Sequence, residues 1–518
     1  MEATESLRLV KANCESFVRL PFRHLVMRGW LHGKICNIMS GVFIYHTIYR
    51  CSNKSGTVVN ITSLKTKIGL IRGDFLLIIA SKSDSKGEIM IDINLIRTNK
   101  EIVKENIKKK FQDAKLPLVD EVFELDIKVR NLKQEGDNLR AERKNLSNQV
   151  GALMREKRIE EANQVKATVV ANNERIEGIE KEVAELETII KQKMMTIPNI
   201  IDDTVPIGKD DNENVEVQRF GEAVVPSYEI PYNADILYAI GGLDKESAGR
   251  TSGNGFYYLL GDAARIHEAM IAYARDYMIE KGFIYAIPPF MIRSDVVTGV
   301  MSFAEMDAMM YKIEGEDLYL IGTSEHSMIG RFKDQMIKES ELPIRLTSYS
   351  PCFRKEVGAH GIEERGIYRV HQFEKQEMIV LCKPEDSMEW YNKMWQYTVE
   401  VFRNLDIPVR QLDCCSGDLA DLKVKSCDIE AWSPRQQKFF EVGSCSTLGD
   451  AQSRRLGIRV KGENGTYFPH TLNNTVLAST RALIALLENN YNEDGTITVP
   501  EVLRSYMGGK SIINPIKK

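Results

Sequence analysis

Two short segments in the C-terminal part of the chain combine side chains that could hold a nucleoside triphosphate. One contains Arg354 and Glu356, which would share one face of a strand, and the other contains Arg369 and Phe373. Arg369 could return on an antiparallel partner, so that two guanidinium groups neutralise phosphates. The ring of Phe373 offers a flat surface on which a base can stack. Taken alone, either segment also fits a surface hairpin with ordinary salt bridges.

Glycine-rich phosphate loops are missing from the same part of the sequence. From Arg219 onward there is neither a G-x-x-x-x-G-K-[ST] loop nor a G-x-G-x-x-G fingerprint. A nucleotide bound here would therefore have to be held by side chains and a metal ion.

The elements that would position these residues alternate between short strands and amphipathic helices, which predicts an α+β domain. The expected strands are Phe256–Leu260, Leu318–Ile321, Leu346–Ser348, Met378–Leu381 and Lys438–Val442. The expected helices are Ala263–Lys281, Glu385–Leu405 and Thr475–Asn489.

A long helical hairpin is expected ahead of this domain. Apolar residues recur with heptad-like spacing over 125–153 and again over 165–190, which places each series on one helix face. No proline lies between Pro117 and Pro198, so neither helix is interrupted. Two helices of about 35 residues, joined near 154–158, would form an antiparallel coiled coil about 50 Å long.

Basic side chains collect where the two helices would join. Between positions 140 and 158 six basic residues outnumber two acidic ones, whereas residues 101–200 carry 19 of each sign. The six are Arg140, Arg143, Lys144, Arg155, Lys157 and Arg158. A basic tip on a long arm could grip a phosphate backbone, which makes RNA a candidate partner. A solvated coiled-coil face or a dimerisation arm would explain the same pattern.

The bulk composition is that of a globular protein. Hydrophobic residues make up 43% and charged residues 27% of the chain, so a sizeable core is expected. A net charge of −4 means that any contact with nucleic acid must be local. Nine cysteines without a C-x-x-C pair predict free thiols, a reducing cytoplasm and no zinc site. No segment resembles a transmembrane helix or a signal peptide, so no membrane contact is expected.

Residues 1–89 differ in charge from the rest of the chain. They carry 13 Lys and Arg against 6 Asp and Glu, a net charge of +7. One interpretation is an appended basic domain that contacts RNA. The other, which we favour, is that these residues are not native coding sequence and that the protein starts at Met90. Codons for the preceding residues, 86–89, can spell a purine-rich bacterial ribosome-binding site.

Several segments resemble class II aminoacyl-tRNA synthetases, and the seryl-tRNA synthetase family in particular. Residues 353–356 and 369–373 resemble motif 2, and Pro288 resembles the motif 1 proline at the dimer interface. Arg481 resembles the arginine of motif 3, and residues 499–507 resemble the C-terminal signature of the family. The helical hairpin resembles the tRNA-binding arm.

The resemblance runs from Met90 to about Gly509 and implies a bacterial-type member with three parts. Residues 1–89 stay an unassigned basic extension, 90–199 form the tRNA-binding helical arm, and 200–518 form the class II catalytic domain. The implied fold is α+β, with a long antiparallel coiled-coil arm followed by a mostly antiparallel sheet flanked by helices.

The resemblance also implies which residues bind each substrate. Serine would be held by Thr323, Ser324, Glu325, Arg354, Glu377 and Thr475. ATP would be held by Arg354, Lys355, Glu356, Arg369, Val370, Phe373, Glu441, Val442, Gly443, Ser444 and Arg481. Glu441 and Ser444 would also hold Mg²⁺, which prefers oxygen ligands. The catalytic residues would be Arg354, Glu356 and Arg481.

These assignments imply a serine–tRNA ligase that forms seryl-adenylate and serylates tRNA(Ser), with tRNA(Sec) as a further candidate substrate. The protein would act as a homodimer in the cytoplasm. Two other functions stay open, a paralogue that charges a carrier protein and a non-catalytic tRNA-binding scaffold. The intact arm argues against the first, because such paralogues lack it, and the retained ATP ligands argue against the second.

Overall fold

The computed structural model describes residues 92–356 and 366–516, together with short strands before residue 78. The chain divides into two compact units, Met1–Gly87 and Glu88–Lys518. In the first unit the described residues form three antiparallel strand pairs, which the sequence analysis did not predict. They are β2 (Cys36–Met39) with β3 (Val42–Tyr45), β4 (Cys51–Ser52) with β5 (Val58–Val59), and β6 (Gly69–Ile71) with β7 (Phe75–Leu77). Met90 and most of the 1–89 extension lie outside the described residues.

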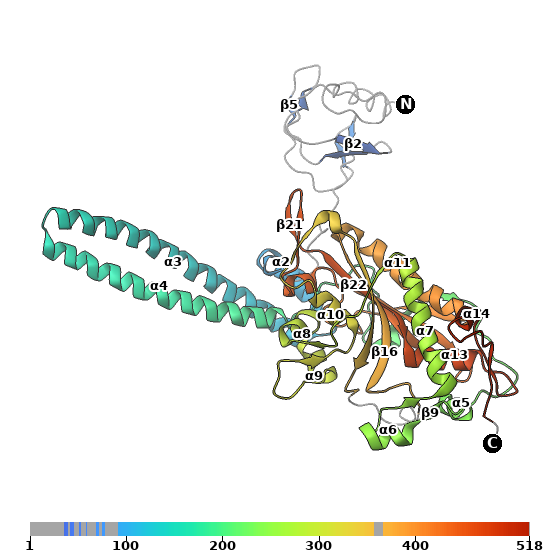
Figure 1. Cartoon of the computed structure of the whole chain (residues 1–518). Helices are drawn as coiled ribbons and strands as arrows, with labels where there is room; N and C mark the ends of the chain where they lie inside the picture. The colour runs from blue at the N-terminus through green and yellow to red at the C-terminus, as the bar shows by residue number, and fades with distance from the viewer. Residues whose placement is uncertain are drawn as a thin grey trace. The chain divides into compact units, whose positions relative to one another are not determined.

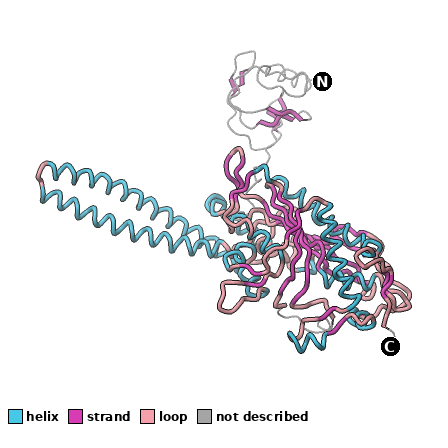
Figure 2. The backbone as a smooth tube through the Cα atoms, in the orientation of Figure 1, coloured by secondary structure: helices cyan, strands magenta, loops and turns pink. Residues whose placement is uncertain are grey.

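A helical hairpin opens the described part of the second unit. Helix α2 (Ile93–Lys109) leads into α3 (Leu116–Arg155) and α4 (Ile159–Met194), which run antiparallel side by side (Figures 1 and 2). At about 1.5 Å per residue, the 40 residues of α3 span roughly 60 Å. The predicted apolar series forms the seam, and one buried cluster in it consists of Val129, Leu132, Ile179, Val183 and Leu186.

Helix α3 begins earlier than the apolar series suggested. Pro117 occupies its first turn, where the missing N–H would have had no partner within the helix. The base of the hairpin is fastened to the following domain by side chains, since Lys115 Nζ lies 2.7 Å from Asp421 Oδ2. The amide of Asn199 donates to the carbonyl of Leu422 at 3.0 Å.

An eight-stranded sheet forms the centre of the following domain. Its strand order is β11–β15–β16–β22–β19–β18–β17–β8, and every pairing is antiparallel except β11 with β15. The strands are β8 (Val215–Phe220), β11 (Ile284–Ala286), β15 (Ile344–Phe353), β16 (Gln372–Cys382), β17 (Val409–Asp413), β18 (Lys425–Ser433), β19 (Lys438–Thr447) and β22 (His470–Ala478). The expected α+β fold with a mostly antiparallel sheet is thereby confirmed.

Helices and smaller sheets of two or three strands surround the central sheet (Figure 1). The helices are α5 (Asn233–Ala239), α6 (Lys245–Ser252), α7 (Gly261–Glu280), α8 (Ser294–Val300), α9 (Phe303–Met309), α10 (Ser324–Gly330), α11 (Ser387–Asn404), α12 (Ala451–Arg455), α13 (Ser479–Asn489) and α14 (Glu501–Arg504). The small strands are β9 (Leu243–Asp244), β10 (Tyr258–Leu259), β12 (Met291–Ile292), β13 (Tyr319–Leu320), β14 (Met336–Lys338), β20 (Arg459–Gly462), β21 (Gly465–Tyr467), β23 (Ile497–Thr498) and β24 (Ile512–Ile513). None of the described helices is both long and apolar enough to cross a membrane.

The two faces of β16 are buried in different cores. Met378 and Val380 pack into a core shared with α7, α11 and α13. Ile379 and Leu381 pack into a second core shared with α8 and α10. This alternation follows from the period of two along a strand, and it assigns the odd-numbered residues of β16 to the face that carries α10.

Thr475 lies in a strand, whereas the sequence predicted that a helix begins at this residue. Strand β22 continues to Ala478, and α13 begins only at Ser479. Thr475 pairs with Glu377 across the sheet, in a run that contains the β-branched residues Thr471 and Val476. The cross-strand pairing outweighs the helical periodicity of the residues that follow.

Candidate active site

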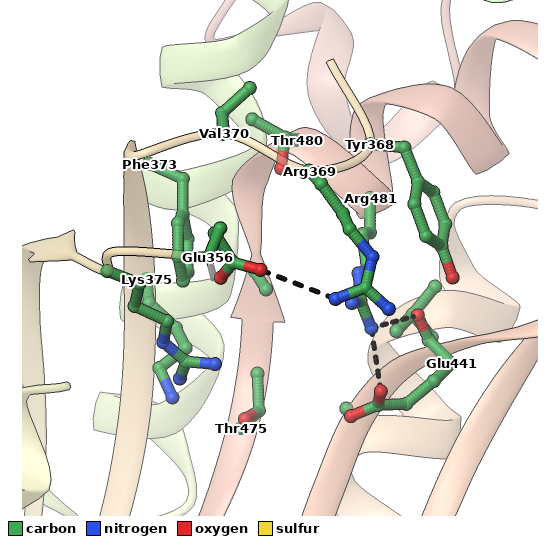
Figure 3. A pocket seen from close by; sticks show the side chains of 14 residues that line it. Glu356, Tyr368, Arg369, Val370, Phe373, Lys375, Glu441, Thr475, Thr480 and Arg481 are labelled. Atoms are coloured by element: carbon green, nitrogen blue, oxygen red, sulfur yellow. Dashed lines mark hydrogen bonds and ion pairs between the residues drawn. The ribbon is translucent and has the colours of Figure 1, made fainter. Parts of the chain in front are cut away.

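A pocket lies over the sheet, bounded by β16, β19, β22 and the start of α13 (Figure 3). Ten of the predicted site residues line it: Arg354, Glu356, Arg369, Val370, Phe373, Glu441, Val442, Gly443, Thr475 and Arg481. Four further residues line it without having been predicted: Tyr368, Lys375, Ala478 and Thr480. The fold therefore brings most of the predicted nucleotide ligands into one place.

Arg354 and Glu356 reach the pocket in a different way from the one expected. Strand β15 ends before Arg354, so the two residues do not share a strand face. Glu356 has a φ of 45°, in the left-handed region that a strand cannot use. The N–H of Arg354 still donates to the carbonyl of His371 at 3.0 Å, and its Cζ lies 5.3 Å from the ring centroid of Phe373.

Two arginine–glutamate pairs stand side by side at the pocket (Figure 3). Arg369 Nη1 lies 3.3 Å from Glu356 Oε2, and Arg481 Nη1 lies 2.7 Å from Glu441 Oε2. Burial alone would raise the pKa of Glu441, but the charge of Arg481 holds that pKa below its ordinary value. Cationic groups for phosphates and an ionised carboxylate for a metal ion are thus close together.

Three residues of β16 share one face of the strand, and two of them, Phe373 and Lys375, line the pocket. Phe373, Lys375 and Glu377 alternate along the strand, and Lys375 forms an ion pair with Glu377 in which both side chains are buried. Glu377 Oε1, the oxygen that pairs with Lys375, also accepts from Thr323 Oγ1 at 3.2 Å and from Thr475 Oγ1 at 3.3 Å. A small substrate with a hydroxyl group would find several hydrogen-bonding partners here.

Glu325 lies in the first turn of α10, whose N-cap is Thr323. The N–H of Glu325 donates to Thr323 Oγ1 at 3.4 Å, and Glu325 Oε1 accepts from Gln452 Nε2 at 2.7 Å. Burial raises the pKa of Glu325. Glu325 is therefore a carboxylate in a poorly hydrated place, and a cation bound beside it would stabilise its charge.

Six predicted site residues do not line the pocket: Thr323, Ser324, Glu325, Lys355, Glu377 and Ser444. The backbone and ammonium groups of Lys355 both donate to carbonyls of α9. Ser324 is fully buried, and its hydroxyl accepts from Ser348 at 2.6 Å. Ser444 Oγ lies 3.3 Å from Ser426 Oγ, on the strand next to its own. The side chains of Lys355 and Ser324 are therefore occupied by contacts that stabilise the fold.

Asp428 is a carboxylate that the sequence analysis missed. It pairs with Ser444 across β18 and β19. Burial, and then the negative charge of Glu441, raise the pKa of Asp428 to about 7. Asp428, Ser444 and Glu441 together offer the hard oxygen donors that Mg²⁺ prefers, so the residues present fit this ion.

One other group of potential metal ligands occurs among the described residues. Cys414, Asp418 and Asp428 each bring a ligand atom within 4.8 Å of the others. Burial raises the pKa of the Cys414 thiol, and a protonated thiol is a poor zinc ligand.

The basic residues at the arm tip are partly neutralised by acids that lie outside the window 140–158. Arg140 lies 2.7 Å from Asp137 and 2.8 Å from Glu180 of the facing helix. Arg158 Nη2 lies 2.6 Å from Glu161 Oε2. Four of the six are exposed and form no ion pair with any described residue: Arg143, Lys144, Arg155 and Lys157. The cationic surface is therefore smaller than the sequence count suggested.

Two family models match this chain, one over the helical hairpin and one over the domain that follows it. Residues 90–201 match the Seryl-tRNA synthetase N-terminal domain, and residues 310–490 match the tRNA synthetase class II core domain (G, H, P, S and T). The serine–tRNA ligase of Thermococcus sibiricus is 42% identical over 453 residues, which cover 83% of this chain and 98% of that protein. The chain belongs to the seryl-tRNA synthetase family.

Solved structures of the seryl-tRNA synthetase family share the fold. The seryl-tRNA synthetase of Pyrococcus horikoshii complexed with ATP has a TM-score of 0.80 at 39% identity, covering 83% of this chain and 100% of that one. The cytoplasmic serine–tRNA ligase of Naegleria fowleri in complex with AMP has a TM-score of 0.76 at 33% identity, covering 83% and 99%. None of these named relatives is bacterial, so they lend no support to the bacterial-type assignment.

Proposed function

We propose that this chain is a serine–tRNA ligase. It activates L-serine with ATP, giving seryl-adenylate and pyrophosphate, and transfers the seryl group to the 3′ end of tRNA(Ser). The observation that carries the proposal is the pocket that Arg354, Thr475 and Arg481 line together, where the hydroxyl of Thr475 donates to Glu377 Oε1 at 3.3 Å. The names and close similarity of the relatives support the same activity.

The arginines neutralise the triphosphate, and Phe373 supplies a surface for the adenine. Arg354, Arg369 and Arg481 approach the pocket from three segments, so that positive charge surrounds the phosphates. Mg²⁺ suits the oxygen donors of Glu441, Asp428 and Ser444, and when bound it supplies further positive charge to the phosphates. The Arg481–Glu441 pair keeps Glu441 ionised for that role.

Serine is held by charge at one end and by hydrogen bonds at the other. Glu325 receives the ammonium group, and Thr475 with Glu377 receives the side-chain hydroxyl. Alanine would leave these buried polar groups unpaired, so the site discriminates against it. The serine carboxylate then attacks the α-phosphorus while pyrophosphate leaves. Positioning and electrostatics supply the rate enhancement, with no side chain acting as a covalent nucleophile.

The arm contacts tRNA through its exposed basic tip, and tRNA(Sec) is a second acceptor within this proposal. The hairpin of α3 and α4 argues against a paralogue without an arm, and the complete pocket argues against a scaffold. The six cysteines of the described residues that are free thiols agree with a reducing cytoplasm. Residues 1–89 are not needed for the reaction.

A second copy of the chain covers the β11 edge of the sheet, which gives a homodimer. β11 is an edge strand, and the apolar side chains of Ile284 and Ile287 are each 67% exposed there, next to Pro288. Exposed apolar groups at a sheet edge are typical of an interface. Sedimentation of Ile284→Asp together with Ile287→Asp tests this, because a monomer is expected and an unchanged dimer would contradict it.

Charging of tRNA with radiolabelled serine tests the proposal as a whole. Serine should be attached to tRNA(Ser) in an ATP-dependent reaction. Arg354→Ala should abolish adenylate formation while the circular dichroism spectrum stays that of the folded protein. A chain that binds tRNA but attaches no amino acid would contradict the proposal and favour the scaffold.

A further inference from the structure

Gln452 joins three separate elements beside Glu325. It lies in α12 and is fully buried. Its Nε2 donates to Glu325 Oε1 at 2.7 Å and to the carbonyl of Val300 at 3.3 Å. Its Oε1 accepts from Thr471 Oγ1 at 2.7 Å. The polar atoms of this buried side chain are therefore all bonded.

These partners fix the direction of the Gln452 amide. The carbonyl of Val300 can only accept, so the amide NH₂ group must face it, and the same nitrogen donates to Glu325 Oε1. The hydroxyl of Thr471 donates to the remaining oxygen. Turning the amide over would set its oxygen against the carbonyl oxygen of Val300, so Gln452 presents an N–H to Glu325 in a single orientation.

Glu325 depends on neutral donors for its orientation. Among the residues that the structure describes, no lysine, arginine or histidine forms an ion pair with it. The neighbouring carboxylate Glu377, in contrast, is paired with Lys375. A buried carboxylate that receives only neutral hydrogen bonds is suited to a cationic ligand, which brings the missing charge with it.

We propose that Gln452 is a positioning residue for serine, which holds the Glu325 carboxylate in the direction that receives the substrate ammonium group. Thr471 acts one step further away, by holding Gln452. The inference rests on the proposed serine activation and deepens it. Burial raises the pKa of Glu325 and the hydrogen bond from Gln452 lowers it, so the same contact also favours the charged form.

The isosteric substitution Gln452→Glu separates positioning from packing. When the new carboxyl is ionised, it sets a like charge against Glu325 and removes the donor, whereas its protonated form restores an O–H donor. In serine-dependent ATP–pyrophosphate exchange, the KM for serine should rise about tenfold or more near pH 8 and by much less near pH 6. The KM for ATP should stay within about twofold of the wild-type value at both pH values.

Two further variants serve as controls. Gln452→Leu removes the donor at every pH, so its serine KM should rise about equally near pH 6 and near pH 8. Thr471→Val keeps the shape but removes the donor that holds Gln452, so a smaller rise of about threefold in serine KM is expected. Thr471→Val decides the question if the variants at Gln452 do not fold.

Wild-type exchange measured in parallel separates this inference from the proposed function. If the wild-type protein shows no serine-dependent exchange, the proposed function fails. If it does, and folded Gln452→Glu has an unchanged serine KM, the positioning role is wrong. An equal, pH-independent rise in the KM values of serine and ATP would likewise overturn it, because it would indicate a general structural defect.

Discussion

Arg481 and Glu441 are joined twice by one guanidinium nitrogen. Arg481 Nη1 lies 2.7 Å from Glu441 Oε2 and 3.1 Å from the carbonyl oxygen of the same residue. The arginine therefore holds both the side chain and the backbone of Glu441. This contact fastens α13 to β19 at the pocket, and it sets the charge where the phosphates of ATP are proposed to lie.

Arg481→Leu should lower the rate of ATP–pyrophosphate exchange by about 100-fold, because it removes a cation from the phosphate site. Without that cation, burial should raise the pKa of Glu441 above its present depressed value. The residual activity should therefore require a higher pH than the wild-type activity does. The pH profile of kcat/KM for ATP is the measurement.

Arg435→Ala is a matched control for this prediction. Arg435 Nε lies 3.3 Å from the carboxylate of Glu488, away from the pocket. Its loss should reduce the melting temperature without moving the acidic limb of the pH profile. The same acidic shift in both variants would contradict the role given to Arg481.

Lys375→Met should destabilise the protein by about 3 kcal/mol, because it leaves Glu377 charged and unpaired in a buried place. The side chains of the pair are only 9% and 3% exposed. Adding Glu377→Gln to Lys375→Met should recover a large part of the lost stability. The single variant Lys375→Met and the double variant should both be inactive. Urea unfolding of the two single variants and the double variant measures the coupling.

The exposed pair Lys393–Glu389 is the control, since its side chains are 43% and 66% exposed. Lys393→Met should cost less than about 0.5 kcal/mol. A loss in the double variant that equals the sum of the two single losses would show that the buried pair is not coupled.

Asp428→Asn should change how stability depends on pH. The pKa of Asp428 in the folded protein, about 7, lies above its ordinary value, so the folded state binds this proton more tightly than the unfolded state does. The stability that this proton contributes is fully present below the ordinary carboxyl value and is lost as the pH rises through about 7.

Without magnesium, the Tm of Asp428→Asn should therefore exceed that of the wild type by about 2 °C near pH 8 and match it near pH 4. Asp203→Asn, on the exposed segment after the arm, should leave the Tm unchanged at both pH values. A constant difference between Asp428→Asn and the wild type across this range would refute the titration of Asp428.

Shortening the arm should strongly reduce tRNA charging and spare adenylate formation. Deleting only residues 140–158 would leave the facing stretch of α4 without its partner helix. Removing residues 143–172 and joining the helices with a short glycine loop cuts both helices at one level, as the 3.0 Å contact between Arg143 and Asn173 indicates. Serine-dependent exchange should stay within about twofold, and charging should fall by about 100-fold.

A variant of full length checks that arm length is not the cause. Replacing Lys144, Arg155 and Lys157 by Glu keeps both helices but reverses the exposed charge at the tip. The KM for tRNA should rise and depend less steeply on salt. Unimpaired tRNA charging by the shortened protein would contradict the assignment of the α3–α4 hairpin as a tRNA-binding arm.

The hairpin was predictable from the sequence because its signal is repeated along both helices. A spacing of three, four and seven residues needs no distant partner to be recognised, and the seam contains Val129, Leu132 and Ile179 as expected. The net charge of the hairpin tip was less predictable, since Glu180 on the facing helix neutralises Arg140. Contacts between helices are set by register, which the composition of one helix does not reveal.

The pocket was predicted in part, and some of the misses had a signal. Lys375 lies between Phe373 and Glu377 on one strand face, so the period of two could have added it to the site. The strand assigned to Arg354 ended earlier than expected. Gln452 carried no signal of its own, because its role depends on a short helix that meets α10 only in the folded chain.

Amino-acid-dependent ATP–pyrophosphate exchange tests the central claim most directly. It should be measured with serine, threonine, alanine and cysteine, on the full chain and on a shortened chain that begins at Met90. We predict exchange with serine alone, at equal rates in both proteins. Exchange that is lost only in the shortened chain would contradict the start at Met90. No serine-dependent exchange in either protein would contradict the assignment of this pocket as a serine-activating site.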